Sequence, residues 1–206
     1  MEFDPAVDGM KPPGMTHNVY SSLVTPRPIG WISTISAAGV VNLAPFSFFN
    51  MVAGDPPTLI YCPGGSHVDG GPKDSLRNVM EVPEFVFNLC TVDLLEVMNA
   101  TSANLPSGVD EMKEAGIEAA PSTRVRPPRV AASPINMECE VVEIVDLPPA
   151  ADHKNTMVIG KAVRIRISDE VIVDGMVDWQ RLRPLGRLGY FDYAGLGEVI
   201  TLPRPA

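Results

Sequence analysis

Residues 26–36 read Pro-Arg-Pro-Ile-Gly-Trp-Ile-Ser-Thr-Ile-Ser, and residues 41–50 read Val-Asn-Leu-Ala-Pro-Phe-Ser-Phe-Phe-Asn. β-Branched and aromatic residues dominate both runs, which predicts two strands joined by a tight turn at residues 37–39. Pro45 has no N–H for a strand ladder, so we expect the second strand to leave the sheet there. The chain would then present a polar, aromatic loop, suited to a flat ligand with polar edges, that contains Phe46, Ser47 and Asn50.

The rest of the chain also favours strands. Further strands are predicted at residues 58–62, 85–90, 137–144, 156–167 and 171–173. The apolar phase switches at Val141-Val142, which predicts a β-bulge, and Ile165 and Ile167 are expected to point inward. Short antiparallel strands predict a mainly β protein with accessory helices, built as a closed or nearly closed small barrel.

A chain of 206 residues with no internal linker predicts one domain over residues 1–206. Residues 1–15, with prolines, glycines and acids, are expected to form an N-terminal arm. Residues 93–116 are expected to form a helical insertion that serves for packing and cover.

Composition excludes several classes of function. The formal net charge of −9 argues against nucleic-acid binding. No apolar run approaches membrane-spanning length, and the acidic start of the chain is unlike a secretory signal. Cys62, Cys90 and Cys139 are far apart in apolar runs, which predicts buried structural thiols and a cytoplasmic location.

Motifs of other enzyme classes are absent from the sequence. No Gly-x-Ser-x-Gly or His-Glu-x-x-His motif occurs, and His17, His67 and His153 lack metal-ligand spacing. No Gly-x-Gly-x-x-Gly fingerprint is present, so a nicotinamide coenzyme would have to dock as a substrate. We therefore predict no metal site and no catalytic side chain.

The segment Lys73-Asp74-Ser75-Leu76-Arg77-Asn78 can begin a helix capped by Asp74 or Ser75. Free amides, a hydroxyl and the Lys73 ammonium would then converge, as a phosphate site requires. From these residues alone, an ordinary capped helix remains the alternative.

Several of these segments resemble the flavin reductase-like, FMN-binding split-barrel family, above all its flavoredoxin-type branch. They are Arg27 to Thr34, Asn42 to Asn50 and Asp55-Pro56-Pro57. Lys73 to Asn78 is similar to the family's Lys-Asp-Thr-x-x-Asn. Pro184 to Gly189, followed by Tyr193, is similar to its Pro-Leu-x-Arg-Leu-Gly-Gly. The resemblance covers roughly Tyr20 to Pro205 and implies an FMN-binding split β-barrel.

The resemblance also implies which residues bind FMN. Ser33 and Thr34 are expected to contact the flavin. The isoalloxazine and ribityl region is expected to be lined by Ala44, Pro45, Phe46, Ser47 and Asn50. The phosphate is expected at Lys73, Asp74, Ser75 and Ser66, with Arg27 as a further candidate. Trp31 either stacks near the ring or belongs to the core, and Arg187 either fixes the C-terminal segment or forms a surface ion pair.

The resemblance implies an FMN-dependent oxidoreductase in which NAD(P)H gives hydride to flavin N5. It also implies a homodimer with the flavin near the subunit interface, with an electron-acceptor protein as a possible further partner. One alternative is a non-enzymatic FMN electron carrier. Another is a binding protein with a repurposed pocket gated by Tyr190, which replaces the second glycine of the family motif; Ser75 replaces the usual threonine conservatively.

Overall fold

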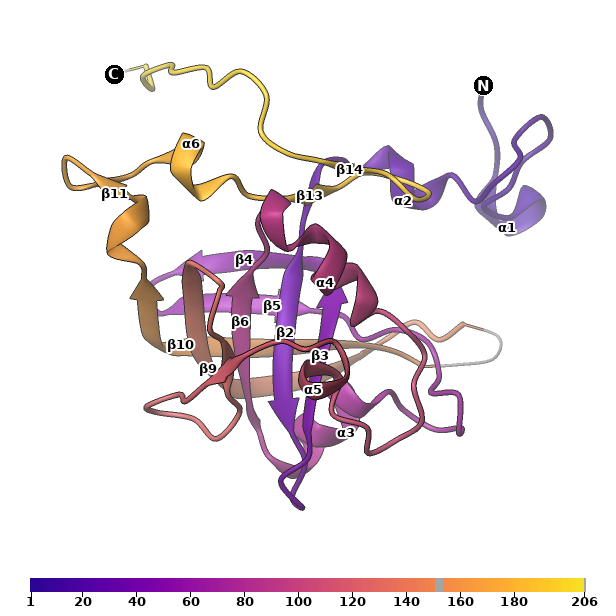
Figure 1. Cartoon of the computed structure of the whole chain (residues 1–206). Helices are drawn as coiled ribbons and strands as arrows, with labels where there is room; N and C mark the ends of the chain where they lie inside the picture. The colour runs from indigo at the N-terminus through magenta and orange to yellow at the C-terminus, as the bar shows by residue number, and fades with distance from the viewer. Residues whose placement is uncertain (151–153, 206) are drawn as a thin grey trace.

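The computed structural model describes residues 1–150 and 154–205 (Figure 1). The elements in chain order are α1 (Pro5–Asp8), α2 (Tyr20–Leu23), β1 (Arg27–Pro28), β2 (Gly30–Ile35), β3 (Val41–Phe46), β4 (Phe49–Gly54), β5 (Pro57–Tyr61), α3 (Asp74–Glu81), β6 (Glu84–Leu89), η1 (Val92–Leu94), α4 (Leu95–Ala100), α5 (Glu111–Glu114), β7 (Ala119–Ala120), β8 (Arg129–Val130), β9 (Ile135–Leu147), β10 (Asn155–Ile167), η2 (Asp169–Val171), β11 (Ile172–Val173), β12 (Met176–Val177), α6 (Trp179–Leu182), β13 (Gly186–Arg187) and β14 (Tyr193–Ala194).

A seven-stranded antiparallel sheet has the order β3-β2-β6-β9-β10-β5-β4. β3 and β4 stand at opposite ends of this order, although only two residues separate them in the chain. Phe46 of β3 and Phe49 of β4 nevertheless belong to the same buried cluster. The sheet is therefore curled into an incompletely closed barrel, and the mainly β prediction is confirmed.

Aromatic rings fill the inside of this barrel. Phe49 stacks on Phe87 with ring centroids 4.8 Å apart, and Tyr61 meets Phe85 at 5.2 Å. Gly160 of β10 lies directly against this packing, because a Cβ there would be 2.2 Å from Phe85 Cε1. Only glycine lets β10 approach the ring so closely.

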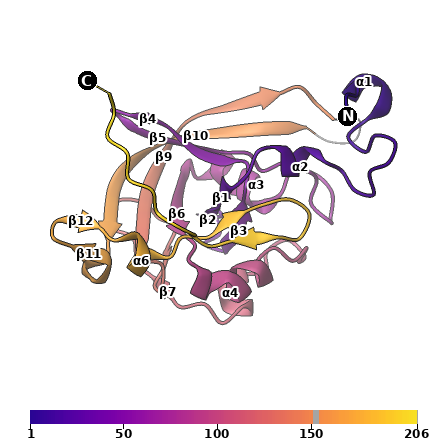
Figure 2. The same cartoon turned by 90° about the horizontal axis from the view of Figure 1, so that it is seen from above.

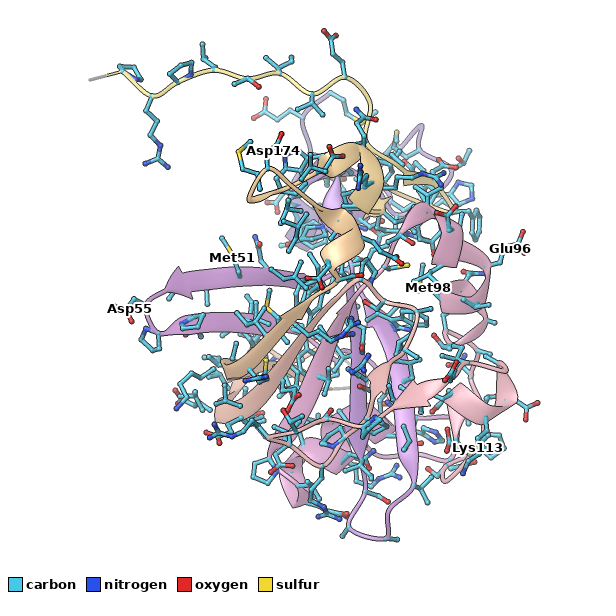
Figure 3. All side chains as sticks on the ribbon, turned by 60° about the vertical axis from the view of Figure 1, so that its left-hand side comes forward. Met51, Asp55, Glu96, Met98, Lys113 and Asp174 are labelled. Carbon is cyan, nitrogen blue, oxygen red and sulfur yellow. The ribbon has the colours of Figure 1, made fainter. Side chains whose placement is uncertain are left out.

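A second buried cluster lies on the outer face of β2 and β3. It comprises Ile29, Trp31, Leu43, Cys90, Met98, Met112, Val130 and Leu185. Figure 3 shows Met98 pointing from α4 toward the sheet, whereas Glu96 of the same helix points away from it. Burial raises the pKa of the Cys90 thiol to about 12, as expected of a structural cysteine.

Local strand geometry confirms some predictions and corrects others. The β9–β10 register shifts opposite Gly160 and leaves Val142 as the extra residue of the predicted bulge. A second shift, at Val163, reverses the phase of β10, and Ile165 and Ile167 are exposed rather than buried. β3 does not end at Pro45 but continues to Phe46; it is an edge strand, where a missing N–H is tolerated.

A smaller sheet, in the order β1-β13-β14, crosses one end of the barrel (Figure 2). It joins the N-terminal and C-terminal parts of the chain, because Arg27 pairs with Arg187 in register. α4 lies at the same end of the barrel (Figure 1). Among the described residues, no helix is long and apolar enough to cross a bilayer.

Candidate functional site

Two adjoining hollows follow β3, one of about 590 Å³ and one of about 150 Å³. Pro45 and Ser102 belong to the walls of both. The larger hollow lies between α4 and the β13–β14 pair, and the smaller lies against the start of α3. Their combined size is typical of a site for a cofactor-sized ligand, which needs roughly 300–1,000 Å³.

The smaller hollow contains a buried polar atom that no protein group satisfies. α3 begins at Asp74, and Lys73 in the N-cap position makes no side-chain capping bond. The prediction that Asp74 or Ser75 caps this helix is therefore wrong, because both lie inside its first turn. Ser75 Oγ is buried without a hydrogen-bond partner. Leaving such a group unpaired costs about 1–3 kcal/mol, so an acceptor supplied by a ligand fits this position.

Lys73 supplies positive charge at this end of the site. No carboxylate of the described residues lies within 4.0 Å of its ammonium. Asp74, in contrast, forms an ion pair with Arg77 and accepts a hydrogen bond from Ser107 Oγ at 3.2 Å. The Asp74 charge is thus balanced by Arg77 of the same helix, and Ser75 and Lys73 remain available to an anion.

Asn78 fixes the orientation of α3 against the barrel. Its Nδ2 donates to Thr34 Oγ1 at 3.1 Å, and both side chains are buried. This bond gives the last residue of the Lys-Asp-Ser-x-x-Asn segment a structural role. Thr34 therefore positions the helix that carries Ser75.

The structure does not bring Trp31, Ser33 or Thr34 to the surface of either hollow, and all three have 0% exposure. Trp31 Nε1 donates to Thr101 Oγ1 at 2.9 Å, and Ser33 Oγ donates to the carbonyl of Pro128. The reason is that β2 is a central strand with both faces covered. The expected flavin contacts of Ser33 and Thr34 therefore find no support in this geometry, and Trp31 takes the core role left open above.

Seven of the expected site residues do come together at the smaller hollow: Ala44, Pro45, Phe46, Ser66, Lys73, Asp74 and Ser75. Ser47 lines the larger hollow with Pro45. Residues 44–47, at the end of β3 and just after it, therefore border the candidate site.

Arg27 and Asn50 lie elsewhere, on a third hollow of about 340 Å³ that also includes Ser47. Arg27 Nη1 donates to the carbonyls of Ser21 and Val24, and burial, followed by the nearby Arg187, lowers the pKa of Arg27. Its Nη1 holds the chain before β1, and Arg27 lines neither of the two hollows along β3. Asn50 is exposed, and its side chain bonds a neighbouring backbone amide.

Arg187 lines the larger hollow and fixes the C-terminal strands there. Its guanidinium lies 4.3 Å from the ring centroid of Tyr193 and donates to the carbonyl of Tyr190. Tyr193 Oη in turn donates to Asn99 Oδ1 of α4 at 3.3 Å. Of the two roles left open for Arg187, the geometry shows the positioning one.

Tyr190 does not line either hollow along β3. Its φ of 55° lies in the left-handed region, where a glycine is favoured. Its ring instead packs edge-on against His17 of the N-terminal arm, with centroids 5.3 Å apart. The structure therefore offers no support for a gate made by Tyr190.

The helical insertion supplies site residues that sequence reasoning missed. The larger hollow includes Glu96 and Asn99, and the smaller includes Ser102 and Glu111. The prediction that this insertion serves only for packing and cover was therefore incomplete. Local sequence gives no sign of these contacts, because they form between segments far apart in the chain.

Glu111 stands out among these additions because it is a carboxylate that is only 8% exposed. Its Oε2 accepts a hydrogen bond from the backbone N–H of Leu43 at 3.1 Å. Burial, with smaller contributions from Asp74 and Asp110, raises the pKa of Glu111 to about 7.

Comparison with known proteins agrees with this architecture. The family model for the flavin reductase like domain matches residues 21–185. The uncharacterized protein BH2278 of Halalkalibacterium halodurans is 40% identical over 187 residues, which cover 88% of this chain and 87% of that protein. Nitrilotriacetate monooxygenase component B from Bacillus cereus superposes with a TM-score of 0.85 at 28% identity, over 98% of each chain.

A further solved structure identifies the fold. It comes from Shewanella frigidimarina NCIMB 400, is described as a flavin reductase with a split barrel domain, and superposes with a TM-score of 0.82 over the whole of both chains. At 21% identity this likeness speaks for the fold alone. The predicted split β-barrel is thereby confirmed.

Proposed function

The chain belongs to the flavin reductase-like domain family, and on this premise we propose that it is an FMN-binding, NAD(P)H-dependent oxidoreductase. The observation that carries the proposal is the buried Ser75 Oγ without a partner, beside Lys73 at the uncapped start of α3. A hydroxyl, an ammonium and helix N-terminal amides together suit a phosphate dianion.

We assign the two hollows to the two ends of such a cofactor. In this proposal Lys73, Ser75 and Ser66 hold the phosphate, and residues 44–47 border the ribityl chain and ring. When bound, the flavin supplies hydride acceptance and onward electron transfer. The protein binds the cofactor, orients it and limits its contact with water, so no nucleophilic side chain is required.

The nicotinamide coenzyme would enter from the open side of the larger hollow, without a dinucleotide-binding motif. Arg187 offers cationic donors there, and Phe191, 83% exposed, offers an aromatic face to a planar ring. The similarity to a monooxygenase component supports a partner oxygenase as one acceptor of the electrons.

We also propose a homodimer in which the β4–β5 hairpin meets the second copy. Figure 3 shows this hairpin, which carries Met51 and Asp55, projecting from the barrel. Met51 is 71% exposed, Val52 is 54% exposed and Phe48 is 50% exposed. Ser47 lines both the larger hollow and the hollow beside Phe48, so a partner placed there would border the flavin. We also propose a cytoplasmic location, because the three cysteines are free thiols, as is usual in a reducing compartment.

Lys73→Ala tests the phosphate assignment. Loss of a charge-assisted contact worth about 1.5–3 kcal/mol should weaken FMN binding about tenfold to 150-fold in a fluorescence titration, while riboflavin binding stays unchanged. Lys113→Ala, at a lysine exposed to 85%, is the matched control. Equal FMN affinities in both variants would contradict the assignment.

A further inference from the structure

Glu111 is held in place by its backbone contact and not by a cation. It is the first residue of α5, whose N-cap Asp110 accepts a hydrogen bond from Lys113 N at 3.2 Å. From there it reaches the edge strand β3 and accepts a hydrogen bond from the N–H of Leu43. In the amide orientation that satisfies the Asn42 side chain, its Nδ2 donates to Glu111 Oε1 at 3.2 Å, and its Oδ1 accepts from the N–H of Leu43 at 3.3 Å.

The charges around Glu111 do not favour its ionised form. No Lys, Arg or His of the described residues lies within 4.0 Å of its carboxylate. Asp110 on its own helix and Asp74 on α3 are the like charges that act on it. Lys113 pairs with Asp110 at 3.1 Å, and His67 and Lys73 line the same hollow. Burial is the largest cause that keeps the pKa of Glu111 near 7.

Glu111 also shares the wall of the smaller hollow with Lys73 and Ser75. Resting on the function proposed above, we propose that Glu111 is a proton-coupled specificity residue, whose protonated form binds the phosphate of FMN more tightly than its ionised form does. An ionised carboxylate repels a phosphate dianion, whereas a protonated one can donate a hydrogen bond. By linkage, FMN binding takes up a proton, and raising the pH weakens binding of FMN but not of riboflavin.

The size of the effect follows from the linkage. If the phosphate raises the pKa of Glu111 by one unit, FMN binds about sixfold more weakly at pH 8.5 than at pH 6.5. At pH 7.5 the complex takes up about half a proton per FMN bound. The phosphate itself, with a second pKa of about 6, is mostly a dianion throughout this range.

Fluorescence titrations of the whole protein with FMN and with riboflavin, at pH 6.5 and 8.5, test the inference. Wild type and Glu114→Gln, an exposed carboxylate on the same helix, should show the pH dependence with FMN only. Glu111→Gln keeps an acceptor for Leu43 N–H and should bind FMN equally at both pH values. A pH dependence that persists in Glu111→Gln would show that another group takes up the proton, and it would overturn the inference.

If Glu111→Gln does not fold, calorimetry of FMN binding to the wild-type protein provides the test instead. Comparing two buffers of different ionisation enthalpy gives the number of protons taken up on binding. Proton uptake with FMN and none with riboflavin supports the inference, and no uptake with FMN overturns it. FMN binding at pH 6.5 that does not change with pH would refute the role of Glu111 but leave the proposed function intact. Absence of FMN binding at pH 6.5 would refute the proposed function as well.

Discussion

Ser75→Ala should change the stability of the empty protein and its affinity for FMN in opposite directions. Ser75 Oγ is buried and unpaired, so its removal takes away a desolvation penalty of about 1–3 kcal/mol. For a chain of this size, each kcal/mol corresponds to a rise of about 2–4 °C in Tm. In the FMN complex the same hydroxyl donates to a phosphate oxygen, a contact worth about 1.5–3 kcal/mol. Its loss should therefore raise the Kd for FMN about tenfold to 150-fold.

Thermal unfolding of flavin-free protein and fluorescence titration with FMN measure the two effects separately. Riboflavin serves as an internal control, because it lacks the phosphate and should bind wild type and variant equally. A variant that is less stable than wild type, with unchanged FMN affinity, would show that Ser75 Oγ serves the fold and not a ligand. A loss of riboflavin binding equal to the loss of FMN binding would also refute the phosphate assignment.

Two further predictions concern the barrel and its surface. Gly160→Ala should destabilise the protein by about 1–3 kcal/mol, because the new Cβ would overlap Phe85, whereas Gly54→Ala, in open space, should stay near wild type in denaturant unfolding. Met51→Asp should weaken the proposed dimer at least tenfold in sedimentation measurements, because it places a charge in an apolar contact; a monomeric wild-type protein would contradict the dimer itself.

Most of the strands could be predicted from local pattern. The bulge at Val142 followed from a switch in apolar phase, and the turn at Asp174-Gly175 has the two positive φ values, 50° and 75°, that its sequence predicts. The exposure of Ile165 could not be predicted, because the second bulge at Val163 depends on pairing with a strand elsewhere in the chain. The curling of the sheet likewise rests on contacts between its two ends.

The candidate site was predictable where its residues are neighbours in sequence. Residues 44–47 and 73–75 lie together on the hollows as their motifs suggested. Glu111 could not be found in this way, because its contact with Leu43 spans 68 positions. Trp31 shows the same limit: the strand pattern left its role open, and the hydrogen bond that accompanies its burial goes to Thr101, 70 positions away.

The central claim, an FMN-dependent reductase, is tested most directly by an anaerobic absorbance spectrum. Purified protein with FMN would be mixed first with NADH and, in a parallel sample, with NADPH. The account predicts that at least one coenzyme bleaches the visible flavin band, which also identifies the coenzyme used. Bound flavin that stays oxidised with both coenzymes, yet is reduced by dithionite, would contradict the claim and indicate an electron carrier.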